Sequence, residues 1–469
     1  VASDVETLRR LGYAQELLRR LDGFSNFAVS LSIICILAGG ITSFHLGLSS
    51  VGGAAIGLGW PLACLFSLVV ALAMAQVASA FPTAGGLYHW SAILGGRGWG
   101  WATAWLNLAG LVIVLAAINV GGCLFTLDSL GPSFGLERKS LHPWAQLGLQ
   151  TGGLVLITFT QGLFNHLGIR VTARLIDFSG YLILVVSAAL TAALLYHAPS
   201  WDLTRLVAFS NYSGERGGGV WPEASSLPWL FVLGLLLPAY TVTGFDASAH
   251  VSEETVAADR NVPRGIVRSV WVSAVGGWVL LSAMVIAIPD LDAGAAKGDQ
   301  VFYWTMGRVL PPWLATALFL GIALAQYLCG LATVTSASRM LYAFARDGGL
   351  PFSAALRRVS AERKAPAAAV WLAAGLSELF TLYTPAYATI TAAGTIFLYL
   401  SYALPIALGF FAYGRTWTRM GPWNLGGWYR PLAALCVVWC GALLVIGFQP
   451  PNEKAFWTVC GAVALLALG

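Results

Sequence analysis

The chain has 469 residues, of which only 10% are charged and 58% are hydrophobic. A soluble domain carries about 25% charged residues. This composition therefore excludes an ordinary soluble enzyme, a nucleic-acid-binding protein and a disordered scaffold. Lipid is the solvent that such a surface fits, and twelve helices of about 20 residues each would use most of the chain. The composition predicts an all-α integral membrane protein.

The predicted elements begin with a charged arm, residues 1–23. Apolar runs separated by polar residues, glycine or proline then predict twelve membrane spans. Their ranges are 24–49, 57–80, 98–125, 144–164, 175–197, 227–250, 265–288, 312–342, 366–382, 386–412, 430–448 and 455–469. A short helix is expected at the membrane surface over 87–96, and an amphipathic stretch over 301–308 is expected to lie above an external vestibule.

Lysine and arginine are unequally divided between the two sides that these spans define. Of the 26 basic residues, 19 fall on the side of the N-terminal arm and 7 on the other. Cytoplasmic loops are enriched in Lys and Arg. The pattern predicts a multi-pass protein of the inner or plasma membrane with its N-terminus in the cytoplasm.

Two spans contain an internal break. The first span contains Ala38-Gly39-Gly40-Ile41-Thr42, and the sixth contains Tyr240-Thr241-Val242-Thr243-Gly244 after Pro238. Breaks at matching positions of two five-span halves are typical of an inverted-repeat transporter with a site near the midplane. The alternative is that the glycines only allow close helix packing, but two matching breaks favour the transporter.

Each broken span is the first of a five-span repeat, so the chain is expected to have four parts. These are the arm 1–23, a first repeat 24–197, a second repeat 227–412 and two further helices in 430–469. Freed N–H groups from Gly40 to Ser43 form a positive dipole end that suits a carboxylate. Freed carbonyl groups from Ala239 to Val242 suit an ammonium group.

Several polar side chains fall at membrane depth, where ionisable groups are costly and often functional. Asp246 follows the second break and is expected either to pair with a helix end or an arginine, or to titrate during transport. Glu253 and Glu254 are interpreted as an inner gate, with solvated loop charges as the alternative. The expected partners in that gate are the arginines that follow in the chain, Arg260, Arg264 and Arg268.

Several motifs together resemble the amino acid–polyamine–organocation permeases, and among them the amino acid/choline transporter branch. They are Ser32-Ile-Ile-Cys-Ile-Leu-Ala-Gly-Gly-Ile-Thr-Ser43, Phe81-Pro-Thr-Ala-Gly-Gly-Leu-Tyr-His-Trp-Ser-Ala92, Gly244-Phe-Asp-Ala-Ser-Ala-His-Val-Ser-Glu-Glu-Thr255 and Ser338-Arg-Met-Leu-Tyr-Ala-Phe-Ala-Arg-Asp-Gly-Gly-Leu-Pro351. The resemblance implies a five-plus-five inverted repeat with broken helices one and six, two additional helices, alternating access and use of an ion gradient.

The resemblance also implies which residues contact the substrate. One wall would hold the substrate carboxylate through Ala38, Gly39, Gly40, Ile41 and Thr42. The other wall would consist of Tyr240, Thr241, Val242, Thr243, Gly244 and Phe245, with Phe245 as a gate.

The coupling ion stays open between sodium, a proton and simple exchange. Some proton-coupled relatives place a lysine in span five, but the matching position here is near Ile183 and that span has no lysine. Thr333 in span eight stands where sodium sites of this fold use a hydroxyl.

The predicted function is secondary transport of a small amino acid or a similar zwitterion, with a GABA-type substrate favoured. Choline or a small amine, a polyamine, and amino acid exchange are the alternatives. No HExxH, nucleophile elbow or Walker A motif indicates a membrane enzyme or a pump, and a channel would favour a continuous pore over two broken helices. No cofactor, metal or nucleic acid is expected; the partners are the substrate and the lipid bilayer.

Overall fold

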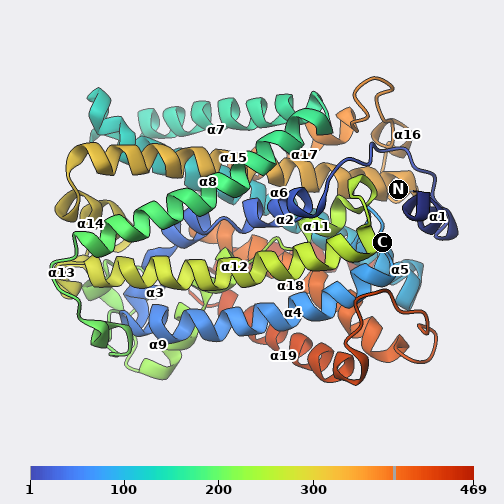
Figure 1. The fold of residues 1–469 in the computed structure, drawn as a ribbon. Coiled ribbons are helices and arrows are strands. Elements are labelled where there is room, and N and C mark those ends of the chain that lie inside the picture. The colour runs from blue at the N-terminus through green and yellow to red at the C-terminus, as the bar shows by residue number, and fades with distance from the viewer. Residues whose placement is uncertain (1, 384–386, 451, 469) are drawn as a thin grey trace.

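The structure is a computed structural model that describes residues 2–383, 387–450 and 452–468. Within these residues the secondary structure consists of helices, apart from two isolated β-bridges. Long helices run side by side along the length of the molecule (Figure 1). The expected all-α fold is confirmed.

Nine helical stretches in the described part of the chain are long and apolar enough to cross a membrane, and two shorter apolar helices accompany them. With the last helix they occupy all twelve predicted positions. The membrane helices after the first are α4 (Trp60–Ala80), α6 (Arg97–Leu130), α7 (Pro143–His166), α8 (Ile169–Tyr196), α9 with α10 (Leu227–Gly234, Leu236–Thr241), α12 (Ala258–Ala287), α15 (Pro312–Arg346), α17 (Ala367–Tyr383), α18 (Tyr387–Ala412), α19 (Tyr429–Gly447) and α20 (Glu453–Leu468).

Some helices continue beyond the predicted apolar runs. α12 begins at Ala258 rather than at 265, and α6 ends at Leu130 rather than at 125. The extra turn of α12 carries the exposed side chains of Arg260 and Arg264. Hydropathy indicates which residues lie in the hydrocarbon core of the bilayer. A helix can continue beyond that core into the polar interface, because its backbone hydrogen bonds are made within the helix.

The two ends of the bundle differ. We call the end that carries the N-terminus the arm end; there lie α1 (Ala2–Arg10), α5 (Leu87–Gly95) and α16 (Ser353–Leu356) (Figure 1). The opposite end, the far end, carries α13 (Leu291–Ala295) and α14 (Val301–Val309). The two short helices expected over 87–96 and 301–308 are therefore confirmed as α5 and α14.

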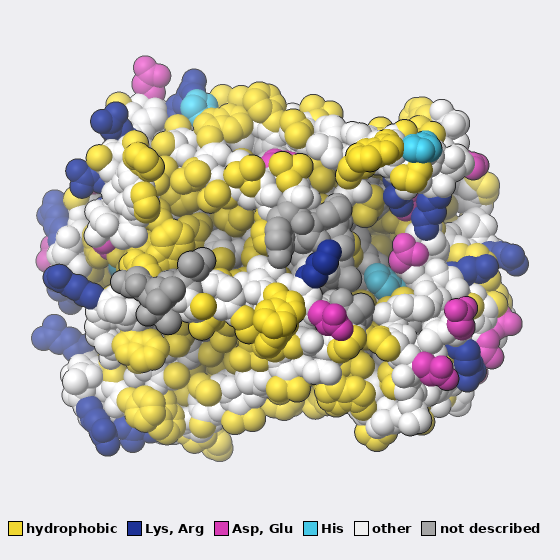
Figure 2. Space-filling model, turned by 180° about the vertical axis from the view of Figure 1, so that it is seen from behind, with side chains coloured by type: hydrophobic (Ala, Val, Ile, Leu, Met, Phe, Trp, Pro, Cys, Tyr) yellow, Lys and Arg dark blue, Asp and Glu magenta, His cyan; other side chains and the backbone are white. Residues whose placement is uncertain are grey.

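The helices divide into a central and a peripheral group. The most apolar stretch of α6 is 83% buried inside the protein, whereas that of α7 is 22% buried. Exposed leucine, valine, phenylalanine and tryptophan side chains cover the peripheral helices. Figure 2 shows hydrophobic side chains across the middle of one face and most of the Lys and Arg toward its ends. This surface fits a lipid bilayer.

The first span is interrupted as predicted, but the interruption begins earlier. α2 (Gly23–Ile34) ends at Cys35, whose φ is 20°, and a π-helical turn, η1 (Ile36–Gly40), follows before α3 (Phe44–Val51). π-helical turns often occur at functional sites.

The sixth span is interrupted after Thr241, and helix resumes with α11 (Ala247–His250) and the short turn η7 (Ser252–Glu254). Gly244 has a φ of 91°, and a Cβ there would lie 2.4 Å from Cγ2 of Ile33. Only glycine fits this backbone and this close approach.

Candidate functional site

The two interrupted spans touch at their breaks, near the middle of the bundle. A Cβ on Gly39 would lie 2.9 Å from Cα of Thr241. A Cβ on Gly40 would meet only side-chain atoms, Leu281 at 3.7 Å and Thr241 at 3.8 Å. Gly39 is therefore the residue that lets the two backbones approach, while Gly40 has ordinary space around it.

A small cavity of about 10 Å³ lies between the breaks. Five of the predicted substrate-binding residues line it: Ala38, Gly39, Tyr240, Thr241 and Thr243. The other lining residues are Ile33, Ile34, Val114, Ile118 and Cys329. A cavity of this size holds about one water molecule, so the site is contracted in this structure. The remaining predicted residues lie around it rather than in its lining.

Side chains donate hydrogen bonds to backbone carbonyl groups at the two breaks. In the first break, Gln326 of α15 donates to the Leu37 carbonyl at 2.9 Å. In the second, Thr243 donates to the Ala239 carbonyl at 2.7 Å, and Tyr399 of α18 donates to the Val242 carbonyl at 3.4 Å. The carbonyl groups of Leu37, Ala239 and Val242 are therefore already hydrogen-bonded in this structure.

A vestibule of about 240 Å³ opens on the far-end side of the breaks. Ile41, Thr42 and Phe302 of α14 are among its lining residues, so α14 lies beside a vestibule, as expected from the sequence. The hydroxyl of Tyr387 lies 2.5 Å from Thr42 Oγ1, and its ring meets Tyr240 edge to face with centroids 6.3 Å apart. These two tyrosines separate the vestibule from the middle cavity.

Phe245 and Asp246 are buried immediately after the second break. The Phe245 ring contacts Tyr402 of α18, with centroids 4.9 Å apart. The Tyr402 hydroxyl donates to Asp246 Oδ1 at 2.7 Å, and the Asn107 amide of α6 donates to Oδ2 at 3.1 Å. His250, one turn further along, lies 3.0 Å from the same Oδ2. Asp246 thus pairs with a histidine rather than with an arginine.

Two ion pairs hold η7 against α15 at the arm end. Arg339 contacts both carboxylate oxygens of Glu254, at 3.0 and 3.1 Å, and both side chains are fully buried. Arg346 contacts both oxygens of Glu253, at 3.0 and 2.9 Å. Glu253 also accepts a bond from the Ala84 backbone N–H at 3.1 Å.

The predicted partners of these glutamates are wrong. Arg260, Arg264 and Arg268 have exposed side chains. They are four residues apart on α12, so they lie on one face of that helix, and that face points away from the core. The partners come from α15 instead.

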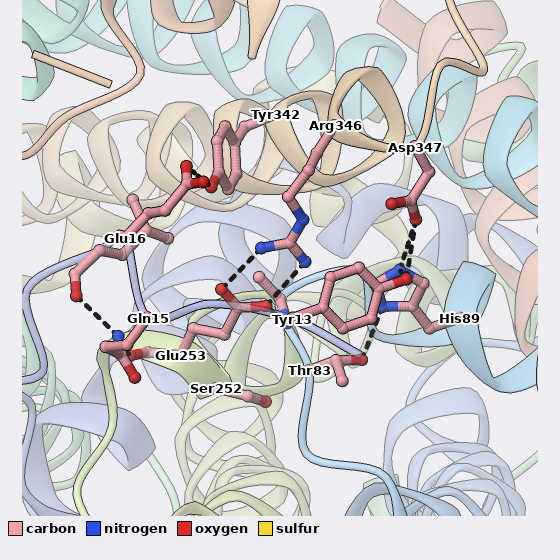
Figure 3. Close-up of polar contacts among 12 residues, drawn as sticks. Tyr13, Gln15, Glu16, Thr83, His89, Ser252, Glu253, Tyr342, Arg346 and Asp347 are labelled. Carbon is pink, nitrogen blue, oxygen red and sulfur yellow. Dashed lines mark hydrogen bonds and ion pairs between the residues drawn. The ribbon is translucent and has the colours of Figure 1, made fainter. Parts of the chain in front are cut away.

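The N-terminal arm passes over the ion pair of Glu253 and Arg346 (Figure 3). The guanidinium of Arg346 lies 4.1 Å from the centre of the Tyr13 ring, and the Gln15 amide donates to the Glu253 carbonyl at 2.9 Å. Tyr13 and His89 both contact Asp347 Oδ2, at 3.0 and 2.8 Å. The arm therefore joins α5, η7 and the end of α15.

The Asp347 carboxylate also accepts a bond from Tyr88. Burial raises the pKa of Asp347, but the hydrogen bond and charge of His89, followed by the bonds from Tyr88 and Tyr13, outweigh it and lower that pKa below its ordinary value. Burial raises the pKa of Tyr13, so its hydroxyl stays a donor at neutral pH.

Thr333, the residue predicted to coordinate sodium, is buried in α15 and donates to the Cys329 carbonyl at 2.9 Å. One turn earlier, Cys329 Sγ lies 3.4 Å from the Ile33 carbonyl at the end of α2. Thr333 thus follows the point where α15 contacts the first break. Its role in ion binding stays a prediction.

Sequence reasoning did not identify Tyr387, Tyr402, Arg339 or Arg346 as parts of this site. Each meets its partner across more than 80 residues of chain. One signal was present in the sequence. Arginines at positions 339 and 346 lie at or near the end of a predicted span, and an arginine buried there requires an acidic partner.

We expect Gly39→Ala to destabilise the folded protein by about 1–3 kcal/mol, because the added methyl group overlaps the Thr241 backbone. Gly40→Ala is the matched control and should change the unfolding free energy by less than about 0.5 kcal/mol. Denaturant unfolding in mixed micelles measures both. Equal effects of the two substitutions would contradict the close approach at Gly39.

We expect Arg339→Met to destabilise the protein by about 3–5 kcal/mol, because it leaves the Glu254 carboxylate buried without a partner. Adding Glu254→Gln to the same variant should restore most of this loss. The exposed pair of Lys139 and Asp299, 3.9 Å apart, supplies the control; Lys139→Met should cost less than about 0.5 kcal/mol. A double variant no more stable than Arg339→Met would contradict the pairing.

Comparison with known proteins agrees with this geometry. The sequence profile of a family described as amino acid permease matches residues 21–467. The amino-acid permease BAT1 of Arabidopsis thaliana is 34% identical over 94% of this chain and 88% of its own length. Its homolog in Oryza sativa is 35% identical, over 94% and 87% of the two chains. The GABA-specific permease of Saccharomyces cerevisiae is 28% identical, over 96% and 79%.

Proposed function

Because the chain belongs to the amino acid permease family, we propose that it is a secondary active transporter that moves a small amino acid or a similar zwitterion across the plasma membrane. A GABA-type substrate is the first candidate, since one relative is named a GABA-specific permease. The family consists of permeases, so the expectation of a transporter rather than an enzyme is confirmed.

The observation that carries the proposal is the contact between two broken helices around a cavity without carboxylates. Among the described residues, its lining contains hydroxyls, backbone and apolar groups, but no Asp or Glu. The expectation of freed N–H groups from Gly40 to Ser43 is corrected here: the Ile41 N–H bonds the Ala38 carbonyl and the Ser43 N–H bonds the Gly39 carbonyl, because a π-helical turn takes the place of an unwound segment. In the proposed binding mode a substrate carboxylate would take over N–H groups of this turn, and an ammonium group would take over carbonyl groups. Such a site suits a molecule that carries both charges better than a polyamine, which requires acidic partners.

Alternating access is supported by the unequal closure of the two sides. Ion pairs and the arm close the arm end, whereas the far-end vestibule reaches Thr42 and stops at the Tyr240–Tyr387 pair. In the proposed cycle the tyrosine pair opens to admit substrate, and opening of the arm end then requires separation of the Glu253 and Glu254 pairs. The two repeats, 24–197 and 227–412, would move relative to each other around the breaks.

The arm end is proposed to face the cytoplasm. The helix ends and loops on that side hold 19 of the 26 Lys and Arg residues, and cytoplasmic loops carry such an excess. Substrate would then enter the vestibule from outside and leave past the N-terminal arm.

We expect one class of small molecule to raise the melting temperature of the purified protein. A ligand at 100 times its dissociation constant adds about 2.7 kcal/mol to the stability of the folded state. The panel contains amino acids, GABA, choline and polyamines, at matched ionic strength. Stabilisation by GABA or another amino acid supports the proposal. Stabilisation by choline or a polyamine alone would replace it with an amine permease.

We expect Tyr387→Phe to destabilise the closed arrangement of the Tyr240–Tyr387 pair, because it removes the hydroxyl that contacts Thr42 and Ser43. A net hydrogen bond contributes about 0.5–1.5 kcal/mol, so substrate dissociation should accelerate by about 2- to 12-fold. Release of radiolabelled substrate from the detergent-solubilised protein measures the rate. Tyr303→Phe, at another residue lining the vestibule, is the control, and an equal acceleration there would contradict the assignment of Tyr387.

A further inference from the structure

Asp246 and His250 form a buried acid–base pair on the arm-end side of the second break. Both side chains are fully buried, and His250 Nε2 lies 3.0 Å from Asp246 Oδ2. Tyr402 and Asn107 donate to the same carboxylate. A protonated Asp246 would use one oxygen as a donor, but Tyr402 donates to Oδ1 and the Asn107 amide, which can only donate, faces Oδ2; we therefore assign Asp246 as an ionised carboxylate. His250 Nε2 must therefore carry the hydrogen of the bond that it shares with Asp246.

This assignment fixes the state of the other imidazole nitrogen. His250 Nδ1 is buried and has no hydrogen-bond partner among the described residues. If Nδ1 carried a proton, it would be a buried charged donor without an acceptor, which is costly. In this structure Nδ1 is therefore an unprotonated lone pair, and the pair as a whole carries one negative charge.

The side chain of Tyr402 connects the pair to the backbone of the break. The Gly244 N–H donates to the Tyr402 hydroxyl oxygen at 3.1 Å, and that hydroxyl donates to Asp246 Oδ1 at 2.7 Å. A change in the charge on Asp246 changes how strongly Tyr402 is held. Tyr402 in turn fixes the N–H of Gly244, whose φ of 91° sets the shape of the break.

We propose that Asp246 and His250 together form the proton-binding site that couples transport to a proton gradient, with His250 Nδ1 as the atom that takes up the proton. The proposal rests on the proposed transport function and decides between the coupling ions that the sequence left open. Uptake of one proton at Nδ1 forms a new N–H bond and turns the pair from a net negative charge into a neutral imidazolium–carboxylate pair. Release on the other side of the membrane returns it to its first state.

The groups around the Asp246–His250 pair are neutral side chains and one arginine that is already paired. α18 contributes the hydroxyl of Tyr402, with Tyr399 behind it, and α6 contributes the amide of Asn107. α2, which packs against α11, contributes Asn26 and Ser30 to its Ser248. α12 brings Gly265 close to that serine. The cation that α15 contributes on this side, Arg339, is bound to Glu254.

A route for the proton leads toward the arm end. A Cβ on Gly86 would lie 3.3 Å from His250 Nδ1, and a Cβ on the adjacent Gly85 would lie 2.6 Å from Nδ1 of His89. The two histidines thus lie against the same glycine pair. His89 and Asp347 line a cavity of about 620 Å³ at the arm end. The glycine pair thus adjoins both Nδ1 of His250 and this second acid–base pair.

The test uses the purified full-length chain in liposomes, with a radiolabelled mixture of the common amino acids and GABA as the probe. Counterflow, with unlabelled mixture inside and equal pH on both sides, measures transport without net proton movement. Accumulation into empty liposomes with an alkaline interior, with and without a protonophore, measures proton coupling. The variants are Asp246→Asn and His250→Gln, which keep polar groups of similar size but do not titrate. The control is His166→Gln, since His166 lies 3.3 Å from the Trp371 indole and outside this network.

We expect the parent and the control to show both activities, with accumulation abolished by the protonophore. Both variants should keep counterflow but lose accumulation by about tenfold or more, because neither can bind the proton. Accumulation at the parental level in both variants would overturn the proposal. So would parental counterflow without a response to the pH gradient, or loss of both activities in both variants, which would leave the pair a structural role. Absence of counterflow in the parent would refute the transport function itself, and this proposal with it.

Discussion

An unpaired backbone N–H or C=O group in hydrocarbon costs several kcal/mol, so a membrane helix can be interrupted only where other groups replace its internal bonds. Here Thr243 of the same span bonds the Ala239 carbonyl, and the other replacements come from neighbouring helices. Gln326 of α15 bonds the Leu37 carbonyl, and Tyr399 of α18 bonds the Val242 carbonyl. The breaks therefore exist because α15 and α18 lie beside them. Under the proposed function, a substrate that bonds these carbonyl groups would exchange the present bonds for its own, which would couple its binding to the positions of both helices.

The inner portions of the two broken spans are joined to each other by several side-chain hydrogen bonds. Ser30 of α2 donates to the Phe245 carbonyl at 2.8 Å, and its oxygen accepts from the Ser248 N–H at 3.0 Å. The Asn26 amide donates to the Ser248 carbonyl. In the proposed opening of the arm end these bonds can stay intact, whereas the bonds of Glu253 to α15 would have to break. α2 and α11 are thus suited to move as one body.

Hydropathy and charge predicted the spans, because lipid imposes the same length and polarity on every membrane helix, and glycine and proline within two of these spans predicted the breaks. The partners within the site could not be predicted this way. A helical period shows which face of α15 carries Arg339, but it does not show that η7 rather than α12 meets that face. The glycine that permits the close approach proved to be Gly39, whereas Gly40 next to it has space. Such differences of about one ångström depend on packing.

The ion pairs at the arm end are a poor device for stability alone. Removing the charges of Glu254 and Arg339 from water costs several kcal/mol each, and their attraction repays this only in good geometry. Apolar residues of similar size would close the same gap at lower cost, but they would close it equally well in any related arrangement. Each arginine makes two hydrogen bonds to its glutamate, and this geometry is met in one arrangement of η7 and α15 only. Arrangements between closed and open leave the charges without these bonds and are therefore unfavourable. Under the proposed function, such pairs would act as a gate that favours two distinct positions of η7, as access from one side at a time requires.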